Sequence, residues 1–475
     1  MLAKGISTNG LPYDKQIFFP LLDYQPEHMV GCINVQPHVN ASNYLGYSNQ
    51  AAYIQLYTKE IGSNKIVVEE DYTDKDYILD FQRFYSRSFG EKEWRTTRVH
   101  FFGGNLTCEE LREELLLPSS TKSLQSDYLG FVVVKPVRNG GKQFIIGRTV
   151  LSTYPENAGD HRRIYIESLQ RANIFGHELF VKSLPFQSQD RAVGACASAA
   201  LWSASNQLFH LFETQRDSMY GITEEANRGV VFESRAFPSQ GLTYRQMCGY
   251  LRMKGLELEF FQIAASNNKD EWKDFISTVL KSFTEAGIPI IAGIALHSKV
   301  VETEGDKDAH VEKHAIVISG YSLNNNGEFN EIYVHDDQIG PYASVISSDG
   351  FLTWKYKTGG WSNYPLITLD SLIVPLYHKI RLPFLEVWMA SKYLSEDSTI
   401  REHSLHLYEV RNYRKRILNL DIDDKETLLT TQMPRYVWVF EATRAGGVKE
   451  EVVLDATAVY PTIVAEFTYN SPIDE

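Results

Sequence analysis

One of the four cysteines, Cys196, has the surroundings of a nucleophile. Small residues flank it throughout residues 194–200, and an apolar helical face follows at Leu201 and Leu208. The thiol is therefore expected at the first turn of a helix, where unpaired backbone N–H groups and the positive end of the helix dipole favour a thiolate. Because a thiolate attacks carbonyl carbons, this position favours nucleophilic acyl transfer.

A base for this thiol must come from another part of the chain, and His314 is the best-placed histidine. It begins an apolar run that continues to Tyr321 and predicts a strand, so its side chain can emerge at the end of a sheet. The next predicted strand ends at Asp336, and the loop at residues 324–327 suits a hairpin. Pairing these strands brings Asp336 beside His314, where a carboxylate can fix the tautomer of the imidazole. Asp337 is the alternative carboxylate.

Two further histidines lie near this pair in the sequence. His310 precedes His314 by four residues, and His335 is next to Asp336, so each is a rival base. The four residues could also be metal ligands, but they do not show two ligands closely spaced on a helix. We therefore expect neither a metal nor an organic cofactor.

The other cysteines show no pattern of their own. Cys32, Cys108 and Cys248 form no C-x-x-C pair, so neither a zinc knuckle nor a redox motif is indicated. We expect all three to be structural, with Cys248 in the core. Four cysteines in 475 residues also fall short of a disulfide framework, which favours a reducing compartment.

These motifs resemble the papain-like superfamily of cysteine peptidases. They are most similar to the peptidases that process bacteriocin leaders and to the stand-alone bacterial relatives of those enzymes. The matching elements are Gln189, Cys196, the Gly-Ile-Pro sequence at 287–289, the strand at 314–321 and Asp336. The resemblance covers about 160 residues and does not reach the first 175 or the last 100.

The resemblance implies an α+β papain-like fold and an enzyme that hydrolyses peptide or isopeptide bonds. Cys196 would be the nucleophile, His314 its acid and base, and Asp336 the residue that orients the imidazole. The implied partner is a protein or peptide substrate. Relatives that cut after paired glycines are usually fused to transporter segments, which this chain lacks, so leader processing within a transporter is not expected.

The resemblance also implies a glutamine that stabilises the oxyanion together with the backbone N–H of Cys196. In the family this glutamine usually lies six residues before the cysteine, a position that Asp190 takes here. Gln189 is the first candidate, after a one-residue insertion, and Gln187 is the second.

Two other functions stay open beside peptide hydrolysis. The same triad would serve a glutamine deamidase or a transglutaminase-like acyl transfer. A papain-like fold could also be a non-enzymatic protein-binding module, for which a thiol of ordinary reactivity at Cys196 would be the sign.

Around the triad, the chain divides into three expected domains. Residues 1–175 contain short β-branched and aromatic runs, such as 131–134, and predict a β-rich domain of unknown role. Residues 176–375 carry the triad. Residues 376–475 predict a small α+β region with an apolar helix at 382–394 and a pair of strands.

Two helices interrupt the β-rich pattern of the first domain. Residues 74–87 carry apolar side chains near helical spacing, which predicts the first. Residues 107–116 predict the second, since Thr107 can cap its start and two glutamates occupy the favourable first turn.

Composition and charge exclude several classes of function. Hydrophobic residues make up 43% and charged residues 23%, which is typical of globular domains. The net charge is −13 and the densest basic run, at 411–416, is short, so no nucleic-acid partner is expected. No stretch approaches the roughly 18 apolar residues of a membrane span, and the N-terminus lacks an apolar signal run. We therefore expect no membrane contact and a cytoplasmic location.

Overall fold

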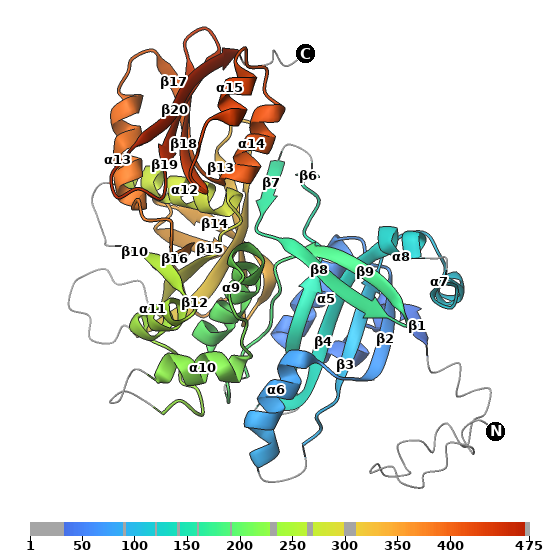
Figure 1. Ribbon diagram of the computed structural model, residues 1–475. Coiled ribbons are helices and arrows are strands. Elements are labelled where there is room, and N and C mark those ends of the chain that lie inside the picture. The colour runs from blue at the N-terminus through green and yellow to red at the C-terminus, as the bar shows by residue number, and fades with distance from the viewer. Residues whose placement is uncertain are drawn as a thin grey trace, which may run out of the picture.

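The computed structural model is an α+β chain in which every strand pair is antiparallel (Figure 1). Three main sheets follow one another along the chain, from blue through yellow to red in the figure. The structure describes residues 33–88, 92–118, 121–139, 143–158, 161–190, 192–228, 235–263, 269–298 and 310–470.

The first sheet has five strands in simple sequential order, each pairing with the next. Its strands are β1 (Asn34–Pro37), β2 (Lys65–Tyr72), β3 (Thr96–Phe102), β4 (Tyr128–Asn139) and β5 (Gln143–Leu151). The helical segments between them are η2 (His38–Asn40), α4 (Ser42–Leu45), α5 (Asn49–Glu60), α6 (Lys75–Arg83), η3 (Tyr85–Arg87), α7 (Cys108–Leu115) and α8 (Thr121–Asp127).

Both helices predicted for this region are present. α7 begins after Thr107, whose hydroxyl accepts from the backbone N–H of Glu110 while the Glu110 carboxylate returns the bond, which completes a capping box. α6 is capped by Asp74 but ends at Arg83, so the predicted helix over 74–87 is divided into an α-helix and the short 3-10 turn η3.

The central sheet contains a closed ring of six strands. Each neighbour in the series β11 to β16 pairs with the next, and β16 pairs back with β11. The ring strands are β11 (Ile290–His297), β12 (Val311–Leu323), β13 (Phe329–Asp336), β14 (Gly340–Ser348), β15 (Thr353–Tyr356) and β16 (Leu366–Tyr377). Because a closed ring leaves few free edges, the relative positions of β12 and β13 are strongly restrained.

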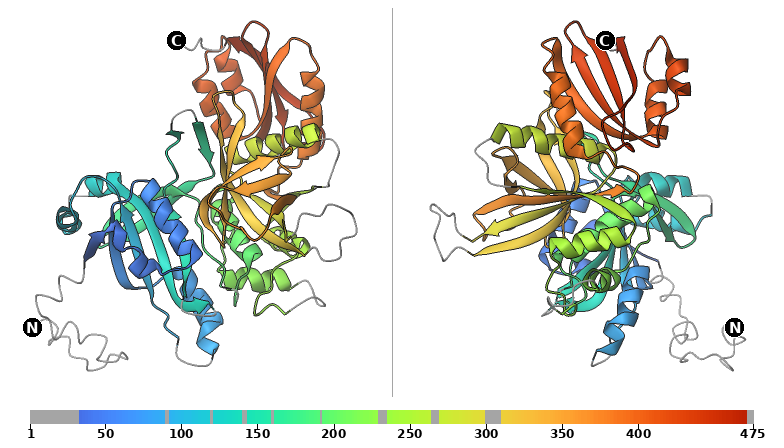
Figure 2. Two further views of the ribbon diagram at one scale, coloured as in Figure 1. Left: turned by 180° about the vertical axis from the view of Figure 1, so that it is seen from behind. Right: turned by 60° about the vertical axis from the view of Figure 1, so that its left-hand side comes forward.

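Helices cover this ring on two sides (Figures 1 and 2). α9 (Cys196–Phe212), α10 (Met219–Asn227) and α11 (Tyr244–Met253) lie on one side. α12 (Lys269–Glu285) lies between the ring and the C-terminal sheet. β10 (Leu256–Gln262) extends the sheet beyond β16.

Strands from before residue 176 also contribute to the central region. β7 (His161–Tyr165) pairs with β12 on one side and with β6 (Asn157–Ala158) on the other. β8 (Ser168–Ile174) and β9 (His177–Ser183) form a hairpin whose turn contains the 175/176 division expected from the sequence. The chain therefore passes between its first two units through paired strands.

The C-terminal sheet has four strands in sequential order. These are β17 (Ile400–Glu409), β18 (Tyr436–Arg444), β19 (Val448–Asp455) and β20 (Ile463–Asn470), accompanied by the helices α13 (Phe384–Ser395), α14 (Val410–Leu418) and α15 (Lys425–Thr430). The predicted apolar helix at 382–394 corresponds to α13, and the predicted strand pair corresponds to β18 and β19, which are joined by a turn that contains Gly446 and Gly447.

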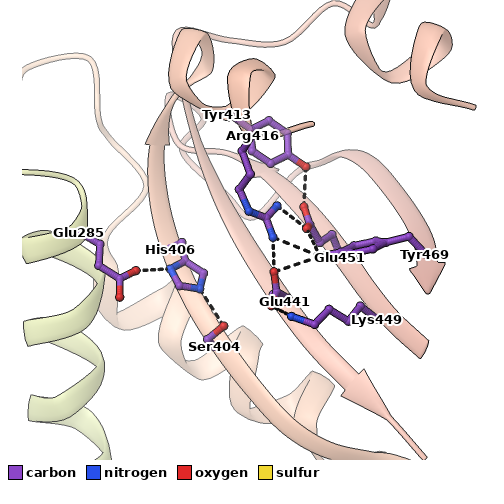
Figure 3. A network of polar contacts seen from close by, with 9 residues as sticks. All are labelled: Glu285, Ser404, His406, Tyr413, Arg416, Glu441, Lys449, Glu451 and Tyr469. Carbon is purple, nitrogen blue, oxygen red and sulfur yellow. Dashed lines mark hydrogen bonds and ion pairs between the residues drawn. The ribbon is translucent and has the colours of Figure 1, made fainter. Parts of the chain in front are cut away.

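A buried polar network stabilises this sheet (Figure 3). Glu451 of β19 is fully buried, and its carboxylate pairs with the Arg416 guanidinium. The same carboxylate accepts hydrogen bonds from the hydroxyls of Tyr413 at 2.8 Å and Tyr469 at 2.9 Å. Arg416 also pairs with Glu441. Each charge in the network is therefore compensated by an opposite charge or a hydroxyl donor.

The three units share one hydrophobic core. Ile54 of α5, Ile316 of β12 and Trp438 of β18 all belong to a single cluster of buried side chains. A buried hydrogen bond of 2.6 Å from the Ser282 hydroxyl to the Leu405 carbonyl joins α12 to β17. Among the described helices, none combines the length and apolarity that crossing a membrane requires.

Candidate active site

Cys196 is the first residue of α9, as the small-residue pattern predicts, and it is half-buried. Ala195 precedes it in an extended conformation, and no side-chain hydrogen bond caps the helix. The first N–H groups of α9 are thus left for a negative charge at this end of the helix. A Cβ at Gly194 would lie 2.5 Å from Cε of Met219, so a larger residue there would require the Met219 side chain to move.

Asp190 organises the loop that leads to the nucleophile. Its Oδ1 accepts three backbone N–H groups, from Ala192 at 3.1 Å, Val193 at 2.8 Å and Gly194 at 2.9 Å. Its Oδ2 accepts the hydroxyl of Tyr85 at 2.6 Å. Asp190 is buried, so these bonds are shielded from water and fix the path of the backbone toward α9.

A second set of hydrogen bonds holds α9 to α10. The Ser198 and Thr223 hydroxyls lie 2.8 Å apart, and Thr223 in turn donates to the Val193 carbonyl at 2.7 Å. All three residues are buried. The first turn of α9 is therefore fixed from the α10 side as well as through Asp190.

His314 projects from β12 toward Cys196. β12 begins at Val311 rather than at His314, because β11 continues to His297 and pairs with this extension. The prediction that His314 starts the strand was therefore wrong by three residues. Nε2 of the buried imidazole lies 3.0 Å from Oδ1 of Asp336, and the Cys196 side chain lies near enough to the ring to raise its pKa and lines the same cleft.

The charge state of His314 is set by opposing effects. Burial lowers the pKa of the imidazole, but the charge and hydrogen bond of Asp336 and the contact with Cys196 raise it. The result is a pKa well above the ordinary value of histidine. His314 is consequently held in its protonated form, with Asp336 as counter-ion.

Asp336 is completely buried and makes four hydrogen bonds. Oδ1 accepts from His314 and from the backbone N–H of Gln338 at 3.0 Å. Oδ2 accepts from the Tyr356 hydroxyl at 2.8 Å and from Nε1 of Trp361 at 2.9 Å. Burial raises the pKa of this carboxyl, but His314 and the donors outweigh it and lower the pKa below its usual range.

Trp361 covers the imidazole as well as binding its counter-ion. Its ring meets that of His314 edge-on, with centroids 4.9 Å apart. The structure places Trp361 against His314, whereas Trp354 is buried and donates its N–H to the Phe351 carbonyl at 2.7 Å.

Asp337 lies close to the same imidazole but in a different environment. Its Oδ1 is 3.6 Å from Nε2 of His314, and neither carboxylate oxygen has a hydrogen bond of normal geometry within the described part of the chain. Burial and the charge of Asp336 raise the pKa of Asp337 to about 7, although His314 and nearby backbone N–H groups act against this. Asp336 is therefore the carboxylate that orients His314.

Ligand atoms of His314, Asp336 and Asp337 lie within 4.8 Å of one another, which is close enough to hold a metal ion. Both oxygens of Asp336 are already occupied by hydrogen bonds. A metal would have to displace the imidazole or its donors, so this arrangement suits a triad better than a metal centre.

The two rival histidines are placed differently from His314. His310 is exposed and pairs with Glu312 at 3.3 Å. His335 is buried between the rings of Phe186 and Tyr342, and burial lowers its pKa to about 3. A neutral, enclosed imidazole of this kind packs as an aromatic ring.

Cys108 and Cys248, like Cys196, are free thiols and half-buried. Cys196 is the one placed beside a histidine in the described part of the chain. Burial raises the pKa of the Cys248 thiol, with a smaller opposing effect from Arg252. Cys32 lies outside the described residues.

The two glutamines proposed for the oxyanion do not occupy equivalent positions. Gln187 is buried away from the thiol, and its Oε1 accepts from Nζ of Lys135 at 3.2 Å. Gln189 is half-buried in the loop before Asp190 and is not among the described residues that line the cleft at Cys196. The structure thus brings Cys196, His314 and Asp336 together without showing either glutamine beside the thiol.

A cleft of about 680 Å³ opens beside Cys196 and His314. The opposite wall is the start of α11 and the loop before it. Tyr244 on this wall donates to the Asp370 carboxylate, which also pairs with Lys313. A substrate carbonyl can therefore approach the thiol from a partly apolar cleft with a fixed polar edge.

Sequence reasoning missed three residues that shape this site: Tyr85, Asp190 in its structural role, and Tyr356. An Asp in a loop is a signal for a turn in which its carboxylate accepts backbone N–H groups a few residues later. No comparable local signal marks the two tyrosines, because their partners lie elsewhere in the sequence. No protein-family model and no curated protein matches the sequence, so the geometry of the site is the basis for assigning its function.

Proposed function

We propose that this protein is a papain-like cysteine hydrolase that cleaves peptide or isopeptide bonds. One observation carries the proposal: the Cys196 side chain, at the start of α9, contacts an imidazole whose Nε2 is held 3.0 Å from a fully buried carboxylate. The bond from Nε2 to Asp336 leaves Nδ1 of His314 for the thiol. The nucleophile thus lies beside its base, and the base lies beside the acid that orients it, which is the arrangement that acyl transfer requires.

The chemistry follows from these positions. The Cys196 thiolate attacks the substrate carbonyl carbon, and a C–S bond forms while the carbonyl oxygen takes the negative charge. His314 then protonates the leaving amine as the C–N bond breaks. In the second half, His314 accepts a proton from water, the resulting hydroxide attacks the thioester, and the carboxylic acid leaves as the thiolate returns.

Asp336 supports both halves of this cycle. Its charge stabilises the imidazolium that donates to the amine. Its four hydrogen bonds hold the carboxylate in place, so the imidazole bonded to it is kept from rotating. The hydroxyl of Tyr356 and the indole of Trp361 hold the carboxylate in turn. The arrangement provides an ion pair whose direction is fixed before substrate arrives.

For the oxyanion we propose the backbone N–H of Cys196, at the uncapped start of α9. Gln189 is the candidate for a second donor, since it lies in the loop that Asp190 fixes. The likeness of the sequence motifs to papain-like peptidases supports the same assignment of fold, in which a helix carrying the cysteine packs on antiparallel strands carrying His314 and Asp336.

The rate of iodoacetamide alkylation at Cys196, followed against pH by site-resolved mass spectrometry, tests the proposal. An ordinary thiol titrates near ~8.5, so an ion-paired one reacts well below pH 7. We expect low-pH reactivity at Cys196 in the wild type and its loss in His314→Ala. Cys248 in the same chain is the matched control and should react alike in both proteins.

A Cys196 that reacts only at high pH, or equally with and without His314, would contradict the catalytic pair and favour the binding-module alternative. If the pair is established, mass spectrometry of peptide products separates hydrolysis from the other acyl transfers. Hydrolysis divides the chain, whereas deamidation or transamidation leaves its length unchanged and alters a glutamine side chain.

A further inference from the structure

A second cavity, of about 840 Å³, lies between α5 of the N-terminal unit and the loop at residues 358–364 of the central unit. Aromatic side chains form much of its wall. These are Tyr53 and Tyr57 of α5, together with Tyr154, Trp361 and Tyr364. Tyr53 and Tyr57 are buried, and Tyr57 donates to the Ser152 carbonyl at 2.6 Å, so this wall is fixed in place.

This cavity adjoins the triad through two of its lining residues. Trp361 packs on His314 and donates to Asp336, and the backbone N–H of Gln338 also donates to Asp336. Glu312, a third lining residue, lies two residues before His314 on β12. Since side chains alternate along a strand, Glu312 and His314 project to the same face of the sheet.

The two cavities relate differently to the imidazole: His314 lines the cleft at Cys196, whereas the second cavity is lined by Trp361, whose ring packs on His314. The cleft that contains Cys196 and Ala197 includes the nucleophile and must hold the acyl part of a substrate. The second cavity is reached from that imidazole, which protonates the leaving amine, across the ring of Trp361. The part of the substrate that departs with this amine is therefore the part that can reach the second cavity.

The charged residues that line the second cavity are both acids, Glu60 and Glu312. The hydroxyl of Tyr154 donates to Oε2 of Glu60 at 2.8 Å, which orients that carboxylate. Glu312 already pairs with exposed His310 at 3.3 Å. Carboxylates beside tyrosine and tryptophan rings form an environment that attracts an ammonium or guanidinium group. The net charge of the chain, −13, also attracts cations at longer range.

We propose that this cavity binds a lysine or arginine side chain carried by the leaving part of the substrate. The inference rests on the proposed function, which defines the acyl part and the leaving part of the substrate. The binding of a cation can nevertheless be measured without catalysis. The wall contributed by α5 makes the N-terminal unit a specificity element of the site.

The test measures binding by isothermal titration calorimetry to the full chain with Cys196→Ala, which cannot turn over. The probes are two dipeptide amides, Lys-Ala-NH2 and norleucine-Ala-NH2. They carry the same α-amine and similar side-chain length, so the side-chain charge is the difference between them. We expect the lysine probe to bind about tenfold more tightly, from one ion pair and its ring contacts.

Glu60→Gln combined with Glu312→Gln should abolish that preference while leaving the weaker binding of the norleucine probe unchanged. Glu109→Gln, an exposed glutamate on α7, is the matched control for loss of charge and should retain the preference. Equal binding of the two probes, or a preference that survives the double substitution, would overturn the inference.

Cleavage by the wild type is measured separately, on peptides with lysine, norleucine or glutamate after the scissile bond. Selective binding without cleavage of any peptide would count against the proposed hydrolase and leave the cation site standing. Cleavage that ignores the residue after the scissile bond would count against the cation site and leave the hydrolase standing.

Discussion

The hydroxyl of Tyr85 donates a 2.6 Å hydrogen bond to Oδ2 of Asp190, so a residue of the N-terminal unit holds the loop that leads to Cys196. Burial and the charge of Asp190 raise the pKa of Tyr85, which keeps its hydroxyl a donor. The other oxygen of Asp190 binds three consecutive backbone N–H groups of that loop. The geometry of the nucleophile therefore depends on an element more than 100 residues earlier in the chain.

Tyr85→Phe should weaken both the fold and the reactivity of the thiol. The substitution leaves Oδ2 of buried Asp190 without its donor, which costs about 1 to 3 kcal/mol in the free energy of unfolding. Because the loop then loses one fixed point, alkylation of Cys196 at pH 6 should slow, by roughly tenfold. Urea unfolding and site-resolved alkylation measure the two effects.

Tyr393→Phe, on the exposed surface of α13, serves as the control for removing a tyrosine hydroxyl. If Tyr85→Phe lowers stability but leaves the alkylation rate at Cys196 as in the wild type, the hydrogen bond stabilises the fold without positioning the nucleophile.

Asp336→Asn should lower the upper pH limit of activity. The negative charge of Asp336 raises the pKa of His314, so the imidazole stays protonated at higher pH than an ordinary histidine. Without that charge the pKa falls, and the proton for the leaving amine is lost at lower pH. We expect kcat to fall by roughly 10²-fold or more and the alkaline limb of the pH–rate profile to move to lower pH.

Tyr356→Phe provides the matched comparison, because it removes one hydrogen bond to Asp336 and keeps its charge. Its alkaline limb should lie between those of the wild type and Asp336→Asn. An unchanged alkaline limb in Asp336→Asn would show that another group controls the protonation of His314.

The parts of this site that could be predicted from the sequence depend on local patterns. The small residues around Cys196 predict a helix start, and α9 begins there. The apolar run after His314 and the strand ending at Asp336 predict a pair of neighbouring strands, and β12 and β13 pair antiparallel. In each case the spacing of a few residues contains the signal, because hydrogen bonds between near neighbours decide the structure.

The remaining parts depend on partners that are distant in sequence. The closure of the ring by β16 on β11 joins residues as far apart in the sequence as Ile291 and Ile373, and no local pattern specifies which strands meet. Tyr356, at the end of β15, and Trp361, in the loop that follows, bind Asp336 from a segment rich in glycine and aromatic residues, a composition that does not specify these contacts. Asp190 stands where the family would place a glutamine, and its role becomes visible only through Tyr85 and the backbone N–H groups that it binds.

Asp337→Asn should make the protein more stable at neutral and alkaline pH. The pKa of Asp337 is raised to about 7 in the folded chain, against about 3.9 for an unfolded one. Between these values the folded state holds a proton that the unfolded state lacks, so folding stability falls as pH rises from about 4 to 7. Asparagine removes this dependence and the cost of a buried charge without hydrogen-bond partners.

We expect Asp337→Asn to exceed the wild type in free energy of unfolding by on the order of 1 to 3 kcal/mol at pH 8, with a smaller difference at pH 5. Urea unfolding at both pH values measures this. Asp423→Asn, at an exposed position, should show no such pH-dependent gain. A gain of equal size at pH 5 and pH 8 would assign the effect to packing rather than to the charge.

Arg416→Met should destabilise the C-terminal sheet strongly, because it leaves the fully buried carboxylate of Glu451 without its cation (Figure 3). Breaking a buried pair from one side costs about 3 to 5 kcal/mol, whereas neutralising both partners costs much less. The double variant Arg416→Met with Glu451→Gln should therefore recover most of the lost stability, since it removes the uncompensated charge and the glutamine oxygen can still accept from one of the two tyrosine hydroxyls, which bond to different oxygens of Glu451.

Urea unfolding followed by the fluorescence of buried Trp438 reports on this sheet. Arg435→Met is the matched control, because Arg435 is half exposed and its partner Glu409 lies 3.4 Å away near the surface, where an ion pair is worth about 1 kcal/mol or less. A double variant no more stable than Arg416→Met alone would show that the charge of Glu451 is not what destabilises the single variant. Recovery in the double variant would show that the uncompensated charge of Glu451 is what destabilises the single one.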